Sequence, residues 1–244
     1  MRNAMSILLV FAMPLAIGYE PMDDALRATE APETLRAAFT VEMQSAKANR
    51  TYKYDPRLPV AERWALLSAR GEDSALDEAG AAWGAELAPD GRLFPDDLRE
   101  SLGTDVKIKD FGAGWRLQFQ HAPSANDSAL DVWASQQLNA VAWLDPVNSC
   151  FLRIDYTLPR PVRGPKGGRL TRFNQSYLLE TEPEWGLSYI SQFKLEFEAK
   201  APFRTIRQSY TAVISEATFF FASSAAEAQY VASDGQSKTQ IAAR

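Results

Sequence analysis

Histidine and cysteine are nearly absent from this chain of 244 residues, which contains one of each. A structural zinc site needs several His or Cys ligands, so His121 and Cys150 alone exclude the usual zinc clusters. A single cysteine also excludes an internal disulfide. A serine hydrolase would have to use His121 as its base, and no G-x-S-x-G motif accompanies that histidine. We therefore predict no catalytic residue, no metal site and no cofactor.

An excess of positive charge is also lacking. The chain has 26 Lys and Arg against 31 Asp and Glu, which gives a formal net charge of −5 and a pI near 5.1. Proteins that bind nucleic acids carry a basic surface that neutralises phosphates. The composition thus argues against a nucleic-acid partner.

Long hydrophobic runs are missing except near the N-terminus, where residues 7–17 are largely apolar. This run is well short of the roughly 20 residues that a membrane-spanning helix needs. Arg2 precedes it, and Ala16-Ile17-Gly18 resembles a cleavage site. We predict a signal peptide over residues 1–18, a periplasmic mature protein and no transmembrane segment in that mature protein. The alternative is an uncleaved N-terminus that is amphipathic or anchors the protein to a membrane.

The pattern that is present in abundance is alternation of apolar and polar residues. In "LSYISQFKLEFEAK", residues 187–200, one parity is mostly apolar and the other mostly polar, as in a half-buried strand. Similar segments are joined by turns at residues 112–114 and 145–149, and they continue to residue 221. They predict nine or ten strands joined as an antiparallel meander, a mainly β fold.

Helical patterns are few. Residues 74–87 and 94–103 predict two short helices inserted within the run of strands, the second with Pro95 near its start and Gly103 at its end. Residues 34–40 have short helical character. We predict a loose leader over 19–33, a single domain over 34–221, and a tail over 222–244 that is disordered or weakly helical.

The shortage of helices bears on the shape of the sheet. Ten strands spaced about 4.8 Å apart would make a flat sheet roughly 45 Å wide, and helices about 15 Å long cannot cover that width. We therefore predict a strongly curved half-barrel with two or three short helices over its concave side.

The concave wall is then a candidate ligand site. In the alternative, aromatic side chains fill the hollow completely. The predicted apolar wall comprises Trp115, Leu117, Phe119, Leu152, Ile154, Tyr156, Phe173, Tyr177, Tyr189, Phe193, Leu195 and Phe197.

A basic loop stands out on this acidic chain. Residues 158–172 contain Arg160, Arg163, Lys166, Arg169 and Arg172 and no acidic residue. Such a loop suits contact with anionic lipid headgroups or with an acidic partner protein. A solvated hairpin tip would have the same composition.

Several segments together resemble a known family. These are "LRAAFTVEMQSA", "YKYDPR", "RWALLS", "AWLDPVNSCFLRIDYTLPRPV" and "FRTIRQSYTAVISEATFF", which follow a predicted signal peptide. In order and spacing they resemble secreted bacterial proteins of the outer-membrane lipoprotein carrier (LolA-like) superfamily. The resemblance implies a curved antiparallel half-barrel closed by helices over a cavity that takes the acyl chains of lipoproteins in transit.

Three functions follow as hypotheses. The first is a soluble periplasmic protein that binds lipid or another hydrophobe without covalent chemistry, as a carrier or chaperone of lipoproteins or lipids in the cell envelope. The second is a non-catalytic envelope adaptor or structural protein with a filled core, whose partner docks on the basic loop or an open sheet edge. The third is a hydrolase that uses His121.

Overall fold

The computed structural model describes residues 20–242, apart from positions 96, 104, 123–128, 165, 166, 202 and 203. The side chains of residues 129–131 and 234–242 are also left undescribed. The predicted signal peptide, residues 1–18, and Lys166 of the basic loop lie outside the described residues.

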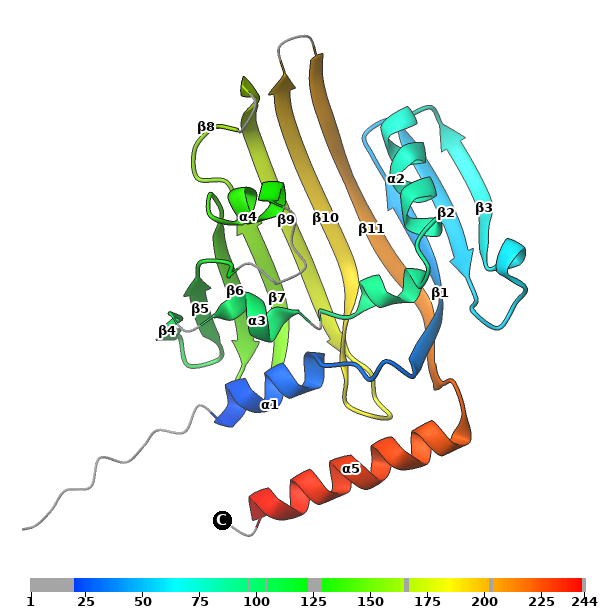
Figure 1. Cartoon of the computed structure of the whole chain (residues 1–244), viewed down its shortest axis with the longest axis vertical. Coiled ribbons are helices and arrows are strands. Elements are labelled where there is room, and N and C mark those ends of the chain that lie inside the picture. Colours follow the sequence, from blue (N-terminus) through cyan, green and yellow to red (C-terminus); the bar gives the residue numbers. More distant parts are fainter. Residues whose placement is uncertain are drawn as a thin grey trace, which may run out of the picture.

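One antiparallel sheet of eleven strands forms the body of the molecule (Figure 1). Its strands are β1 (Leu35–Gln44), β2 (Ala48–Tyr54), β3 (Trp64–Gly71), β4 (Lys107–Asp110), β5 (Trp115–Phe119), β6 (Asn139–Asp145), β7 (Cys150–Thr157), β8 (Val162–Arg163), β9 (Arg169–Thr181), β10 (Ser188–Ala201) and β11 (Arg204–Phe221). The sheet is curved and open, and short helices lie across it. The predicted fold class, a mainly β half-barrel, is confirmed.

The turns between strands have the chemistry that the sequence indicates. Asp145 accepts hydrogen bonds from the backbone N–H of Val147 at 2.8 Å and of Asn148 at 3.2 Å, which closes the β6–β7 turn. Gly112, in the turn between β4 and β5, has a φ of +83°, which glycine adopts without strain. The hairpins predicted at residues 112–114 and 145–149 are therefore confirmed.

The order of strands across the sheet is β3-β2-β1-β11-β10-β9-β7-β6-β5-β4, with β8 paired to β9. Consequently β3 and β4, which are consecutive along the chain, lie at opposite edges of the sheet. The connection between them crosses the concave face (Figure 1). It carries α2 (Ser74–Gly84), the 3-10 helix η2 (Pro89–Leu93) and α3 (Leu98–Leu102).

The two helices predicted in this connection are confirmed as α2 and α3. Asp73 caps α2 by accepting hydrogen bonds from the backbone N–H groups of Ala75 and Leu76. Gly103 follows α3 with a φ of +60°. A further 3-10 turn, η1 (Val60–Glu62), precedes β3.

The N-terminal predictions are wrong in two places. Residues 20–29 do not form a loose leader but the helix α1 (Glu20–Thr29), whose buried residues Ala25, Leu26 and Thr29 recur at helical spacing. Residues 35–40 are not helical but belong to β1. Strand pairing with β11 overrides the helix propensity of Leu35–Ala38. Alternate residues from Phe39 to Met43, where β1 also pairs with β2, are buried.

Two further helices lie in the described residues. The α4 helix (Ala129–Ser135) lies between β5 and β6 and was not predicted. In the tail, α5 (Ser224–Ala242) is helical, and Tyr230 packs its ring 5.3 Å from that of Phe221. Within the predicted tail, residues 224–242 are thus helical.

Side chains fill the concave side in two places. The first, the α2 core, joins α2 and η2 to β1, β2 and β11, and includes Phe39, Tyr52, Tyr54, Leu76, Trp83, Leu93, Phe94, Tyr210 and Ala212. The second, the α1 core, joins α1 and α3 to β5, β6, β7 and β9, and includes Leu26, Leu98, Leu102, Leu117, Phe119, Leu144, Phe151, Ile154 and Leu179. The hollow is thus partly filled from both ends.

Candidate functional site

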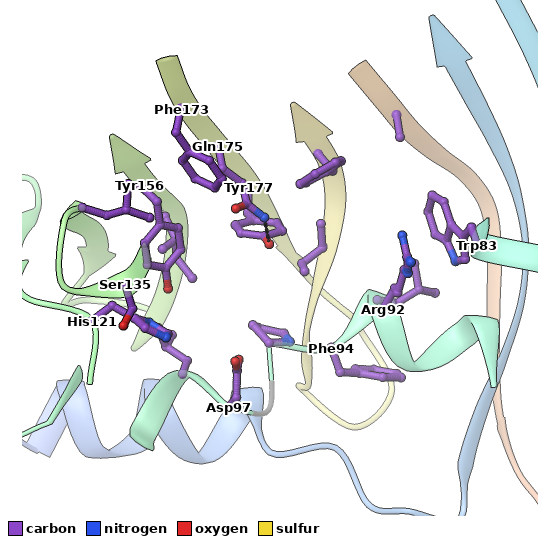
Figure 2. Close-up of a pocket in the computed structure, with 18 of the residues that line it drawn as sticks. Trp83, Arg92, Phe94, Asp97, His121, Ser135, Tyr156, Phe173, Gln175 and Tyr177 are labelled. Atoms are coloured by element: carbon purple, nitrogen blue, oxygen red, sulfur yellow. Dashed lines mark hydrogen bonds between the residues drawn. The ribbon is translucent and has the colours of Figure 1, made fainter. Parts of the chain in front are cut away.

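A cavity of about 580 Å³ lies between the α2 core and the α1 core (Figure 2). Its wall has contributions from the sheet, from the crossing connection and from α4. It is lined by Trp83, Arg92, Leu93, Phe94, Pro95, Asp97, Leu98, His121, Ala134, Ser135, Leu138, Ile154, Tyr156, Phe173, Gln175, Tyr177, Ile190, Phe193, Tyr210, Ala212 and Ile214. The filled-core alternative predicts no cavity of this size.

Five of the residues predicted from the sequence as wall residues line this cavity: Ile154, Tyr156, Phe173, Tyr177 and Phe193. They come from the adjacent strands β7, β9 and β10, and the rings of Tyr156, Tyr177 and Phe193 contact one another in that order. The ring centroids of Tyr156 and Tyr177 are 6.3 Å apart, and those of Tyr177 and Phe193 are 5.3 Å apart. The sheet side of the cavity therefore contains a row of contacting aromatic rings.

Two predicted wall residues lie elsewhere because β-bulges shift the alternation. The pairing of β6 with β7 shifts register between Trp143 and Leu144, which leaves Leu152 unpaired and 47% exposed. A second shift, in β10 between Ile190 and Gln192, puts Ile190 into the cavity wall. Tyr189 instead packs its ring 5.0 Å from Phe219. A strict period of two cannot reveal such an inserted residue.

Five other predicted wall residues also lie outside the lining. Leu117 and Phe119 are buried in the α1 core, and Trp115 packs against it, because α1 and α3 fill that part of the hollow. Leu195 and Phe197 share a face of β10 with Phe193 but lie further along the strand, beyond the cavity.

Much of the lining comes from the connection that crosses the sheet and was not assigned to the site from the sequence. Trp83 lies on α2, Leu93 on η2 and Leu98 on α3. The helical pattern of residues 74–87 and 94–103 was recognised. The strand order decides which sheet residues these helices face. The sequence pattern does not indicate the strand order.

An ion pair anchors the crossing connection to the sheet. Asp90 of η2, whose side chain is 3% exposed, accepts hydrogen bonds from Arg36 of β1 at 2.7 Å and 2.8 Å. It also accepts one from the backbone N–H of Ala37 at 3.0 Å. These bonds raise the pKa of Arg36 and place Leu93 and Phe94, which follow Asp90, over the cavity.

Four of the polar side chains that line the cavity carry hydroxyl groups: Ser135, Tyr156, Tyr177 and Tyr210. Burial, together with the charge of Asp97, raises the pKa of both Tyr156 and Tyr177 well above the ordinary value for tyrosine. Burial also raises the pKa of Tyr210. All three phenols are therefore protonated at neutral pH, and the Tyr177 hydroxyl accepts a hydrogen bond from Gln175.

Two charged side chains, Asp97 and Arg92, also line the cavity. Asp97 points into the cavity in Figure 2. The guanidinium of Arg92 lies 5.4 Å from the centre of the Trp83 ring and pairs with Glu86. The strand arginines are absent from the lining, and Arg116 and Arg153 instead line a separate depression with Lys194.

His121 lines the cavity, with its ring perpendicular to that of Tyr156 at 5.6 Å. Its Nδ1 is buried and has no hydrogen-bond partner in the part of the chain that the structure describes. Ser135 also lines the cavity, but its hydroxyl donates to the backbone carbonyl of Val132 at 2.9 Å. This geometry does not provide the serine-to-histidine hydrogen bond that a hydrolytic pair uses.

The predicted headgroup contacts lie away from the cavity. Arg160, Arg163 and Arg169 are exposed on the segment around β8 and at the start of β9. Within the described residues, no group of three or more His, Cys, Asp or Glu is placed to hold a metal ion. No helix in that part of the chain is long and apolar enough to cross a membrane.

Comparisons with known proteins add little. No protein-family model and no curated protein matches the chain. Among solved structures, a LolA superfamily protein from Nitrosomonas europaea matches with a TM-score of 0.32 and 9% sequence identity, over 82% of this chain and 91% of that one. A likeness at this TM-score supports no functional assignment.

Proposed function

We propose that this protein binds a lipid acyl chain or a comparable hydrophobe in the cavity between the α2 core and the α1 core, and carries it without covalent chemistry. The observation that carries the proposal is the size of the cavity together with its aromatic lining. Ligand sites typically have volumes of about 300–1,000 Å³, apolar walls and a few polar groups, and a volume of about 580 Å³ falls within that range.

The polar groups in the wall fit the uncharged end of such a ligand. Gln175 and the protonated phenols of Tyr156 and Tyr177 can hydrogen-bond an ester or amide carbonyl. Burying a carbonyl without a partner is unfavourable, so these groups favour an acyl ester or amide over a plain hydrocarbon.

The proposed setting is the periplasm, after cleavage of the predicted signal peptide at residue 18. Native mass spectrometry of the purified protein tests both parts of the proposal. The mass of the polypeptide reports cleavage, and a lipid that survives purification gives a second, heavier species.

Binding is tested directly with a fluorescent fatty acid. Ala134 lies on α4 and lines the cavity, so Ala134→Trp should fill part of the volume and weaken binding by at least about tenfold, since lost ligand contacts of about 1.4 kcal/mol suffice for that change. The matched control is Ala82→Trp, which places the same side chain at an exposed position of α2. It should bind as tightly as the unmodified protein.

The proposal fails if the unmodified protein neither retains a lipid nor binds the probe at micromolar concentration. It also fails if Ala134→Trp and Ala82→Trp bind the probe equally well, because the ligand would then occupy another place.

A further inference from the structure

Positive charge is concentrated at one end of the sheet. The segments 158–172 and 198–208 contain eight of the 26 Lys and Arg but one of the 31 Asp and Glu, a net charge of +7. The remaining 18 basic and 30 acidic residues give the rest of the chain a charge of −12. We call the described residues of these two segments the cationic end.

Strand pairing brings the two segments together. Arg163 of β8 lies directly opposite Arg169 of β9, which in turn lies opposite Lys200 of β10. Like charges on directly paired residues destabilise a sheet. The fold nevertheless places three cations in one row, an arrangement that an anionic partner would stabilise.

Few local anions neutralise this end. Glu198 pairs with Arg207 at 3.0 Å and with Lys200 at 4.0 Å. Within the described residues, Arg163, Arg169 and Arg204 form no ion pair, and all three are exposed. The cationic end therefore presents unpaired guanidinium groups to solvent.

An apolar strip links this end to the cavity. Beyond Phe193, which lines the cavity, the same face of β10 carries Leu195, Phe197 and Ala199, all partly buried. The ring of Phe197 lies 6.5 Å from that of Phe173, another lining residue. Ile206 of β11 lies opposite Ala199 and is 38% exposed. Figure 1 shows the ends of β9, β10 and β11 extending past α4.

We propose that the cationic end docks on the surface of a membrane that contains anionic phospholipids, with the apolar strip leading from that surface to the cavity. This inference rests on the proposed function for the passage of the ligand, but the docking can be measured by itself. The exposed Ile206 and the partly buried Phe197 and Ala199 lie at the same end of the sheet as the cations, which favours a lipid surface over an acidic protein or nucleic acid. The rest of the chain has a net charge of −12 and is repelled by the same anionic surface. This repulsion orients the molecule with its cationic end toward the membrane.

The test is binding of the full mature chain to vesicles of phosphatidylcholine with or without phosphatidylglycerol. Binding should require phosphatidylglycerol and should weaken as salt is raised, because salt screens surface charges. Each Lys or Arg near an anionic surface contributes about fivefold in affinity. The triple variant Arg163→Gln, Arg169→Gln, Lys200→Gln should therefore bind the vesicles about 100-fold more weakly.

The matched control is Lys47→Gln, Lys53→Gln, Lys107→Gln, which removes three exposed cations from other parts of the sheet and changes the net charge equally. It should keep vesicle binding. Equal losses in the two triple variants, or no binding of the unmodified protein to anionic vesicles at low salt, would overturn the proposal. Tighter binding to poly-glutamate than to the vesicles would overturn it in favour of an acidic protein partner.

Probe binding separates this inference from the proposed function. The cationic-end variant should still bind the fluorescent fatty acid, which also shows that it is folded. Ala134→Trp should lose the probe but keep vesicle binding. Vesicle binding by a protein that never binds the probe would refute the carrier function and leave the docking intact.

Discussion

At the scale of single residues, the cavity is defined by tyrosines that cannot easily ionise. Tyr156 and Tyr177 lie on adjacent strands with their rings nearly perpendicular, and each is buried enough for its pKa to rise. A phenolate in such surroundings loses hydration that few protein groups replace. The hydroxyls therefore serve the cavity as neutral hydrogen-bonding groups.

This burial predicts a specific dependence of stability on pH. An unfolded tyrosine ionises near pH 10, whereas Tyr156 and Tyr177 ionise at higher pH in the folded chain. Their contribution to stability is complete below about pH 10 and is lost as the pH rises toward the folded pKa. In that window, the free energy of unfolding should fall by up to about 1.4 kcal/mol per pH unit for each tyrosine, measured by urea unfolding.

The control is a titration of the tyrosines, in which absorbance at 295 nm reports the ionisation of their phenols. In the native protein some tyrosines should ionise at higher pH than they do in guanidinium. Replacing both residues, Tyr156→Phe with Tyr177→Phe, should reduce this late-ionising fraction and also reduce the pH slope of stability. If all tyrosines of the native protein titrate together near pH 10, the buried, neutral state assigned to these two is wrong.

At the scale of elements, α2 depends on two glycines to approach the sheet. A Cβ at Gly80 would lie 2.3 Å from the hydroxyl oxygen of Tyr52, and one at Gly84 would lie 2.3 Å from Cδ1 of Trp64. Tyr52 and Trp64 are stacked at 5.1 Å. The helix therefore rests directly on an aromatic pair, which is how Trp83 comes to line the cavity.

Gly80→Ala tests this close approach. Alanine favours an isolated helix by about 1 kcal/mol over glycine, but the clash with Tyr52 should outweigh that gain and destabilise the protein by about 1–3 kcal/mol. Gly91→Ala is the control, because no atom lies within 4 Å of its added Cβ, and it should change stability by less than about 0.5 kcal/mol. Urea unfolding that found Gly80→Ala as stable as the original would contradict the packing of α2 described above.

At the scale of the whole molecule, the strand order creates the site. Because β3 and β4 are at opposite edges of the sheet, the chain between them must cross from one edge to the other, and it does so over the concave face (Figure 1). The helices of this segment cover the hollow of the sheet. Their side chains fill it at the α2 core and at the α1 core, and the cavity lies between these two cores. The pair of Arg36 with Asp90 joins the middle of this crossing segment to β1.

Asp90→Ala should therefore weaken both the fold and the site. Loss of the buried carboxylate leaves the backbone N–H of Ala37 without this acceptor and leaves Arg36 with only its hydrogen bond to the Tyr54 hydroxyl. The expected cost is about 3 kcal/mol, typical of a broken buried ion pair, and probe affinity should fall as η2 loosens.

Asp24→Ala, which removes an exposed ion pair with Arg27 on α1, is the matched control for Asp90→Ala. It should cost less than about 1 kcal/mol. Thermal unfolding and probe titration of the two variants check both effects. Equal stability of the two variants would show that the Asp90 pair does not anchor the crossing segment.

Sequence reasoning succeeded where local rules dominate. Turns with Asp145 and Gly112, the alternation of β10 beyond its bulge, and the helices α2 and α3 were predicted from neighbouring residues. It failed at Leu152 and Tyr189, where bulges shift the alternation by one residue. It also missed α1, and it mistook the start of β1 for a helix because an alanine-rich stretch leaves the choice to its tertiary neighbours.

By itself, the sequence determined that this protein is a curved, mainly β structure, because alternation is a local property and few helices were available to cover a flat sheet. Only the tertiary structure decided which alternating residues face a void and which face a core. That outcome depends on the long-range pairing of β1 with β11 and on the path from β3 to β4. Such pairing is set by the packing of residues distant in the chain, which no short sequence pattern records.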